Sequence, residues 1–139
     1  MKVNFDIIDN HSVAFEKRLI DLHNNFDFVG FNYNIVEREI KLYWIKSIGI
    51  WVDKNEFSGL VLTHKSVNYL KVVDQDENST LEDDACLGEI TFSPSTMREM
   101  NDSIIPKSKP DEKDDILYLF ENGARIRIHC EQILLNLQI

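Results

Sequence analysis

The residues with the clearest capacity for chemistry form an acidic run over 74–84, which places six carboxylates within eleven residues. Asp74, Asp76 and Asn78 occupy positions 1, 3 and 5 of a DxDxN pattern, which is typical of calcium-binding loops. The pattern then fails, because Ser79 replaces the glycine of the sharp turn and no glutamate stands at position 12. We therefore interpret the run as a solvated acidic loop, with an irregular calcium site as the weaker alternative, and we expect no metal centre.

The net charge of the whole chain is concentrated around this run. Residues 1–73 carry nine acidic and nine basic residues, and residues 116–139 carry two of each. The segment 74–115 carries thirteen acidic residues against four basic ones, so it holds the entire net charge of -9. A concentrated negative potential steers cationic proteins and repels phosphate. We expect a basic protein partner and no nucleic-acid binding, unless the stretch only keeps the protein soluble.

The residues expected to contact this partner combine the acidic run with one aromatic anchor. Trp51 stands between Gly49 and the turn-forming residues 53–55, which favours an exposed position for its ring. A role like that of an immunity or antitoxin protein, which neutralises a cationic toxin without catalysis, fits such a surface. The complete set of predicted partner-binding residues is Asp74, Asp76, Glu77, Glu82, Asp83, Asp84 and Trp51.

Catalytic motifs are not found. The chain has no GxSxG sequence around a nucleophile and no glycine-rich phosphate loop. None of the four histidines stands at a metal-binding spacing from another. We therefore predict no catalytic residues and no cofactor, and we expect a binding protein in preference to an enzyme.

The alternative function is that of a small-molecule-binding domain or an enzyme. Its pocket would lie near Trp51, His64, Tyr69 and Arg127, with His129 as a further ligand-binding residue beside Arg127. The competing interpretation of His64 is a hydrogen-bonded core histidine. Arg127 and His129 would then belong to the solvent side of a sheet.

The elements that must position these residues are mostly strands, and the clearest is a hairpin near the C-terminus. A strand over 116–121 runs into Asn122-Gly123, the preferred dipeptide of a two-residue type I′ turn, and returns over 124–130. Apolar and basic residues alternate in the return strand, which predicts one buried face and one wet face. A last strand is predicted over 135–139.

A second hairpin is predicted over 26–48. The apolar alternation changes phase across Gly30, which predicts a β-bulge there. After a turn near 36–38, one parity is apolar and is expected to face the core, namely Ile40, Leu42, Trp44 and Ile48. The next segment, 59–73, is apolar on both parities, so we expect a strand at the centre of the sheet that is covered on both faces or broken by a bulge near Ser66.

Helical patterns are few. Residues 12–23 predict one amphipathic helix, with Ser12 as its N-cap and apolar residues at i, i+4 and i+7, namely Phe15, Leu19 and Leu22. Ser93-Pro94 predicts the start of a second, short helix that extends toward Ile105.

Together these patterns predict an α+β fold, a mainly antiparallel, meander-like sheet with one N-terminal helix and a second short helix. A chain of 139 residues suits one core, so we expect a single domain over 1–139 with an acidic, loop-rich excursion at 74–115.

The same sequence bears on the compartment and on self-association. The N-terminus does not resemble a secretory signal, and no apolar run approaches the roughly 20 residues that a membrane span needs. Cys86 and Cys130 lack a CxxC spacing and are expected to be reduced thiols. We therefore expect a cytoplasmic protein that does not bind membranes, and we consider a homodimer through an edge strand such as 135–139.

Overall fold

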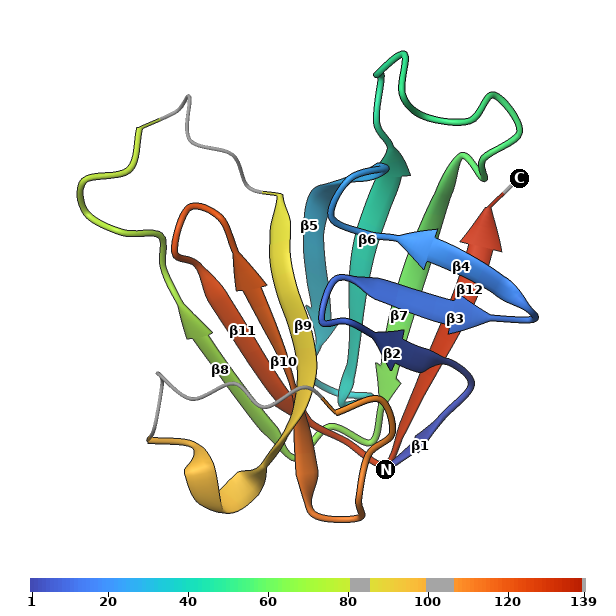
Figure 1. The fold of residues 1–139 in the computed structure, drawn as a ribbon. Helices are drawn as coiled ribbons and strands as arrows, with labels where there is room; N and C mark the ends of the chain where they lie inside the picture. The colour runs from blue at the N-terminus through green and yellow to red at the C-terminus, as the bar shows by residue number, and fades with distance from the viewer. Residues whose placement is uncertain (81–85, 100–106, 139) are drawn as a thin grey trace.

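The computed structural model describes residues 1–80, 86–99 and 107–138, and it is built almost entirely from strands (Figure 1). The strands are β1 (Lys2–Val3), β2 (Asp6–Ile8), β3 (Ser12–Phe15), β4 (Arg18–Asp21), β5 (Phe26–Asn34), β6 (Glu39–Lys46), β7 (Gly59–Lys65), β8 (Tyr69–Val73), β9 (Leu87–Pro94), β10 (Asp114–Phe120), β11 (Arg125–His129) and β12 (Gln132–Gln138). One 3₁₀ turn, η1, spans Ser95–Met97.

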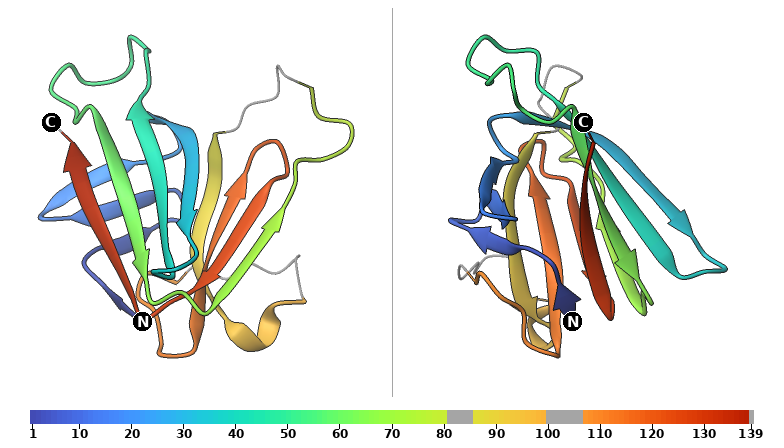
Figure 2. Two further views of the ribbon diagram at one scale, coloured as in Figure 1. Left: turned by 180° about the vertical axis from the view of Figure 1, so that it is seen from behind. Right: turned by 90° about the vertical axis from the view of Figure 1, so that its right-hand side faces the viewer.

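These strands form three sheets. A five-stranded sheet has the order β1-β12-β7-β6-β5, and a four-stranded sheet has the order β8-β11-β10-β9. The two sheets face each other as the layers of a sandwich (Figure 2). The third sheet, β2-β3-β4, is a small meander beside β9, where Ile90 N–H donates to the Asn10 carbonyl at 2.7 Å. All pairings are antiparallel except β1 with β12.

Two strand pairs connect the layers at a shared corner. β7 pairs with β12 in the five-stranded sheet. β8, which follows β7 in the chain, pairs in the four-stranded sheet with β11, which precedes β12. The segment from β7 to β8 bends after Ser66, which has a positive φ of 56°. The predicted interruption near Ser66 is confirmed in position, but it is a connection between two sheets and not a bulge within one strand. The two strands on either side of Ser66 differ in position, because β7 lies in the middle of one sheet while β8 lies at the edge of the other.

The core lies between the two layers. Trp44 on β6 contacts Tyr118 on β10, with ring centroids 6.1 Å apart, and Phe28 on β5 contacts Phe120 at 4.5 Å. The residues predicted to face the core on β6 and β11 are buried: Ile40, Leu42, Trp44, Ile126, Ile128 and Cys130. Both hairpins are thus confirmed, including the bulge at Gly30, where the pairing register shifts.

The predicted turn of the C-terminal hairpin is wrong in detail. Phe120 N–H donates to the Ala124 carbonyl at 2.9 Å, so the loop has three residues and not two. Gly123 closes it with a φ of 89°, a conformation that glycine adopts without a steric penalty.

The α+β prediction is wrong at the N-terminus, since residues 12–23 form strands β3 and β4 and not a helix. The apolar positions also fit a strand alternation, in which Val13 and Ile20 pair across the ladder and are both fully buried. Leu19, which a helix would have buried, is 63% exposed. Burial against the core therefore outweighed the helical spacing.

The second predicted helix is also wrong over its described part. Only the 3₁₀ turn Ser95–Met97 follows Pro94, which has an extended ψ of 137° and provides no side-chain cap. Residues 100–106 of that prediction lie outside the described part of the chain. Within the described ranges there is no α-helix, and no helix is long and apolar enough to cross a bilayer.

Candidate functional site at the loop end of the sandwich

Four connections lie at one end of the sandwich, which we call the loop end. They are residues 22–25, 47–58, 74–80 and 121–124, at the upper end of the molecule in Figure 1. Asp76 N–H donates to the Asn122 carbonyl at 3.0 Å, which ties the described part of the acidic loop to the β10–β11 turn.

The two most exposed apolar residues of the described chain, Ile48 and Ile50, lie on the 47–58 connection beside Trp51. Ile48 is 102% exposed, Ile50 is 104% exposed and Trp51 is 68% exposed. We call these three residues the apolar tip. The prediction that Ile48 faces the core is wrong, because β6 ends at Lys46 and Ile48 already belongs to the loop. Clustered exposed apolar side chains of this size mark an interaction surface.

The apolar tip is held in place by contacts at its base. The Trp51 indole N–H donates to the Asn24 carbonyl at 2.9 Å. The ring lies against Gly49, where an added Cβ would come within 2.3 Å of it. Val52 is buried and anchors the following turn. Because these contacts order the tip in advance, a partner would not have to supply that ordering free energy on binding.

Carboxylates lie at the same end of the molecule as the apolar tip. Asp74, Asp76 and Glu77 are exposed on the 74–80 connection. Glu121 is half exposed in the neighbouring turn. The remaining predicted contacts, Glu82, Asp83 and Asp84, lie outside the described residues.

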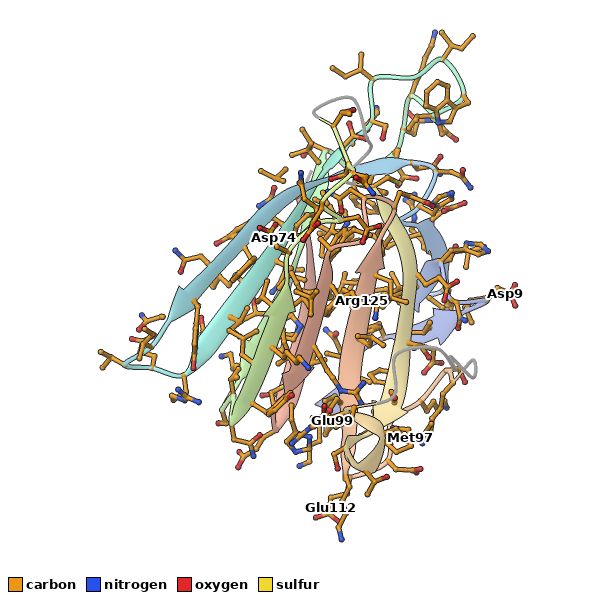
Figure 3. All side chains as sticks on the ribbon, turned by 90° about the vertical axis from the view of Figure 1, so that its left-hand side faces the viewer. Asp9, Asp74, Met97, Glu99, Glu112 and Arg125 are labelled. Atoms are coloured by element: carbon orange, nitrogen blue, oxygen red, sulfur yellow. The ribbon has the colours of Figure 1, made fainter. Side chains whose placement is uncertain are left out.

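Several described acidic residues of the segment 74–115 lie away from this surface. Asp74 and Glu112 lie toward opposite ends of the four-stranded sheet (Figure 3). Asp114 is buried and accepts a hydrogen bond from Lys107 at 2.6 Å, and Asp115 is fully buried. The acidic surface available to a partner is therefore smaller than the sequence pattern indicated.

A pocket of about 460 Å³ opens between the apolar tip and the β10–β11 turn. Its lining residues come from connections at the loop end, from Cys86 directly before β9 and from Asp27 on β5: His23, Asn24, Asp27, Ser47, Trp51, Cys86 and Glu121. Of these, only Trp51 was predicted as a binding residue. The others are polar residues from separate parts of the chain, of which only His23 and Asn24 are adjacent, so no sequence motif links them.

Cys86 and His23 lie together in this pocket, yet their hydrogen bonds oppose nucleophilic catalysis. The Cys86 thiol donates to the His23 carbonyl at 2.9 Å, which favours the protonated sulfur. His23 Nδ1 is 2.8 Å from the Leu87 carbonyl, so this nitrogen must carry a hydrogen and donate it. It cannot accept the thiol proton from Cys86 Sγ, 3.6 Å away.

The residues of the alternative pocket are separated. His64 is fully buried in the core, where Nδ1 is 3.0 Å from the Ile40 carbonyl and Nε2 is 2.7 Å from the Tyr118 hydroxyl. Trp51 lies at the loop end. Tyr69 and Arg127 lie on the outer face of the four-stranded sheet, together with His129. The structure thus brings together three of the five predicted ligand-binding residues.

Those three residues surround Asp115. Arg98 binds both Asp115 carboxylate oxygens at 2.8 Å, and Arg127 Nε donates to one of them at 2.6 Å. His129 Nδ1 lies 3.2 Å from the other oxygen, and Tyr69 packs under the Arg98 guanidinium at 3.7 Å. Burial raises the pKa of Asp115, but the hydrogen bonds from the two arginines outweigh it and hold the pKa below its ordinary value.

This cluster fastens the segment after η1 to the sheet. Arg127 also donates to the Ser93 hydroxyl and to the Pro94 carbonyl, which occupies its remaining donors on that side. Arg127 is only 5% exposed, so the prediction of a wet face on the return strand fails at this residue. With both arginines committed to Asp115, the cluster is a structural ion-pair network.

Metal chemistry has no support within residues 1–80, 86–99 and 107–138, where no three histidine, cysteine or acidic side chains form a group that could hold an ion. The chain matches no protein-family model, and comparison with curated proteins and with solved structures finds no relative or structural neighbour. Its function must therefore be argued from the chemistry of its own surface.

Proposed function

We propose that the loop end binds a basic protein partner without catalysis, in the manner of an immunity or antitoxin protein. The observation that carries the proposal is the full exposure of Ile48 and Ile50 beside the ordered Trp51. Interfaces obtain most of their binding energy from a few apolar and aromatic anchors near their centre.

The charge of the partner follows from the carboxylates at the loop end. Asp74, Asp76, Glu77 and Glu121 give this end a negative potential, which attracts cationic proteins and accelerates their association. The same potential repels anionic lipid headgroups, which favours a protein over a membrane as the occupant. A cytoplasmic location is part of the proposal, and it agrees with two cysteines that form no disulfide.

The experiment is affinity capture with the whole chain as bait, in low and in high salt. The first variant, Ile50→Glu, removes an anchor, and its matched control, Val36→Glu, makes the same change at a residue that is 93% exposed in the β5–β6 turn. We expect the wild type and the control to capture the same basic protein. Ile50→Glu should lose that protein in both salt conditions.

A second pair of variants tests the charges. Asp74→Asn, Asp76→Asn and Glu77→Gln together should weaken capture in low salt, whereas the same neutralisation of Asp9, Glu37 and Glu112 should not. If the wild type bound neutral phosphatidylcholine vesicles and Ile50→Glu did not, the loop end would be a membrane-binding surface and not a protein-binding one. Equal capture by Ile50→Glu and Val36→Glu would also refute the proposal.

A further inference from the structure

Strand β8 forms one edge of the four-stranded sheet. On its inner side it pairs with β11 in an unbroken register, from Tyr69 opposite His129 to Val73 opposite Arg125. On its outer side no described strand pairs with it. Such an edge presents a row of N–H and C=O groups that can pair with another chain.

The other edges of the two large sheets are covered or distorted. The Asn4 amide accepts from Leu135 N–H at 2.8 Å and donates to the Leu135 carbonyl at 3.2 Å, which covers β12 beyond the short β1. Asn10 occupies Ile90 N–H on β9, and β5 carries the bulge at Gly30. Among the described edge strands of the two large sheets, β8 is thus the one with regular pairing and without such a covering contact or bulge.

An apolar groove of about 210 Å³ lies beside this edge, between the two sheets. β5 contributes Phe28 and Phe31 to the groove, and β8 contributes Val72, which is 49% exposed. The groove is completed by Val73, Asp74, Phe120, Asn122, Ala124 and Ile126. Side chains of a strand added to β8 would alternate between this groove and the outer face of the sheet.

The apolar and charged residues along β8 indicate which residues an added strand should carry. Val72 lies opposite the core-facing Ile126, so Leu70 and Val72 share the inner face of the sheet, and both Val72 and Asp74 line the groove. Lys71 lies on the other side and is exposed. An added strand would therefore place apolar residues opposite Leu70 and Val72, a basic residue opposite Asp74 and an acidic residue opposite Lys71.

A second copy of this chain does not satisfy that pattern. Antiparallel pairing of two β8 strands about their centre places Lys71 opposite Lys71 of the other copy, and like charges directly opposite are destabilising. A shift of the centre to Val72 places Leu70 opposite Asp74. Two chains of net charge -9 also repel each other.

We propose that an extended segment of a partner protein adds to β8 as a fifth, antiparallel strand, with its apolar residues in the groove and an arginine or lysine beside Asp74. The inference deepens the proposed function and rests on it for the protein nature and positive charge of the partner. The strand adds backbone pairing to the contacts that the partner makes at the apolar tip.

The test uses a defined probe, the peptide acetyl-Arg-Thr-Val-Glu-Val-Thr-amide. Paired antiparallel to β8, its arginine lies opposite Asp74, its glutamate opposite Lys71 and its valines opposite Val72 and Leu70. The control peptide exchanges the arginine and the glutamate, so its composition is identical. We expect the control to bind about tenfold more weakly to the full chain, measured by NMR titration of the β8 amide signals.

Backbone pairing is tested separately from the side chains. N-methylation of the peptide nitrogens that face β8 keeps every side chain but removes the donors, and it should abolish binding. The bound peptide should also slow hydrogen exchange of every second β8 amide. Val72→Lys in the protein should abolish binding, whereas the matched change Val36→Lys should leave it unchanged.

Each outcome decides between the two proposals. The Ile50→Glu variant should still bind the peptide, because the apolar tip lies outside the groove. Equal binding of both peptides, or full binding of the N-methylated one, overturns the strand addition without affecting the partner at the apolar tip. Should Val72→Lys fail to fold, the N-methylated peptide decides the question with the wild type.

Discussion

The His64 imidazole and the Tyr118 hydroxyl, which come from different sheets, share a hydrogen bond of 2.7 Å in the centre of the sandwich. Nδ1 of His64 must donate to the Ile40 carbonyl, so Nε2 is the acceptor and the ring is neutral. Burial lowers the pKa of His64 to about 4 and raises the pKa of Tyr118 well above its ordinary value. At neutral pH the hydrogen bond therefore joins two uncharged groups from the two layers.

His64 should make stability depend on pH. Above pH 6.5 the histidine is neutral in both states, whereas between pH 6.5 and about 4 only the unfolded chain takes up the proton. The free energy of unfolding should therefore fall by about 3 kcal/mol across that window because of this group. Urea titrations at several pH values measure it. His64→Gln should flatten the slope between pH 7 and 5, and an unchanged slope would contradict the assignment.

Tyr118→Phe should leave His64 Nε2 buried without a donor. We expect a loss of about 1 to 3 kcal/mol in the free energy of unfolding at pH 7, since an unsatisfied buried acceptor keeps its desolvation cost. Tyr43→Phe, which removes a hydroxyl from a half-buried ring, is the matched control and should change the free energy by less than about 0.5 kcal/mol. Equal effects would show that the hydrogen bond contributes nothing.

Asp115→Asn should be among the most destabilising single changes. It leaves Arg98 and Arg127 beside a neutral group, and breaking a buried ion pair costs about 3 to 5 kcal/mol. Because the pKa of Asp115 is lowered in the folded state, its contribution is present above pH 4 and is lost as the pH falls through that lowered pKa. Asp111→Asn removes an exposed partner of Lys107 and should cost less than about 1 kcal/mol in the same urea titration.

The Glu16-Lys17 turn distinguishes the hairpin from the helix that the sequence pattern favoured. Both residues have positive φ, 47° and 67°, which suits Asn-Gly far better than Glu-Lys. Glu16→Asn with Lys17→Gly should raise the free energy of unfolding by about 1 kcal/mol. The alanine pair Glu16→Ala with Lys17→Ala, which would favour a helix, should lower it. If the alanine pair melted at a higher temperature than the Asn-Gly pair, the helical interpretation of residues 12–23 would be favoured instead.

Asn4→Ala should uncover the edge of β12 at Leu135. The change removes two hydrogen bonds, so we expect a loss of about 1 kcal/mol and faster hydrogen exchange of the Leu135 amide. The uncovered edge should also promote self-association in light scattering. Asn32→Ala, at an exposed site on β5, is the control. The homodimer through an edge strand stays a prediction, and Asn4→Ala is the variant in which that dimer should be more stable.

The two hairpins around Gly30 and Gly123 were predictable from the sequence, because a turn and the alternation beside it are local properties. The break at Ser66 was predictable for the same reason. The segment 12–23 was not, since its apolar spacing fits both a helix and two short strands. Only burial of Val13 and Ile20 against the rest of the molecule decides between them.

The sequence by itself determined the turns of the two long hairpins, which faces of β6 and β11 are apolar and where the excess acidic residues stand along the chain. Only the tertiary structure decided what those acidic residues do. Folding buries Asp115 between two arginines, one of them 12 positions later in the chain, and leaves Asp74 exposed beside an apolar groove. Charge along a chain is additive, whereas the potential at a surface depends on which charges meet a partner inside the fold.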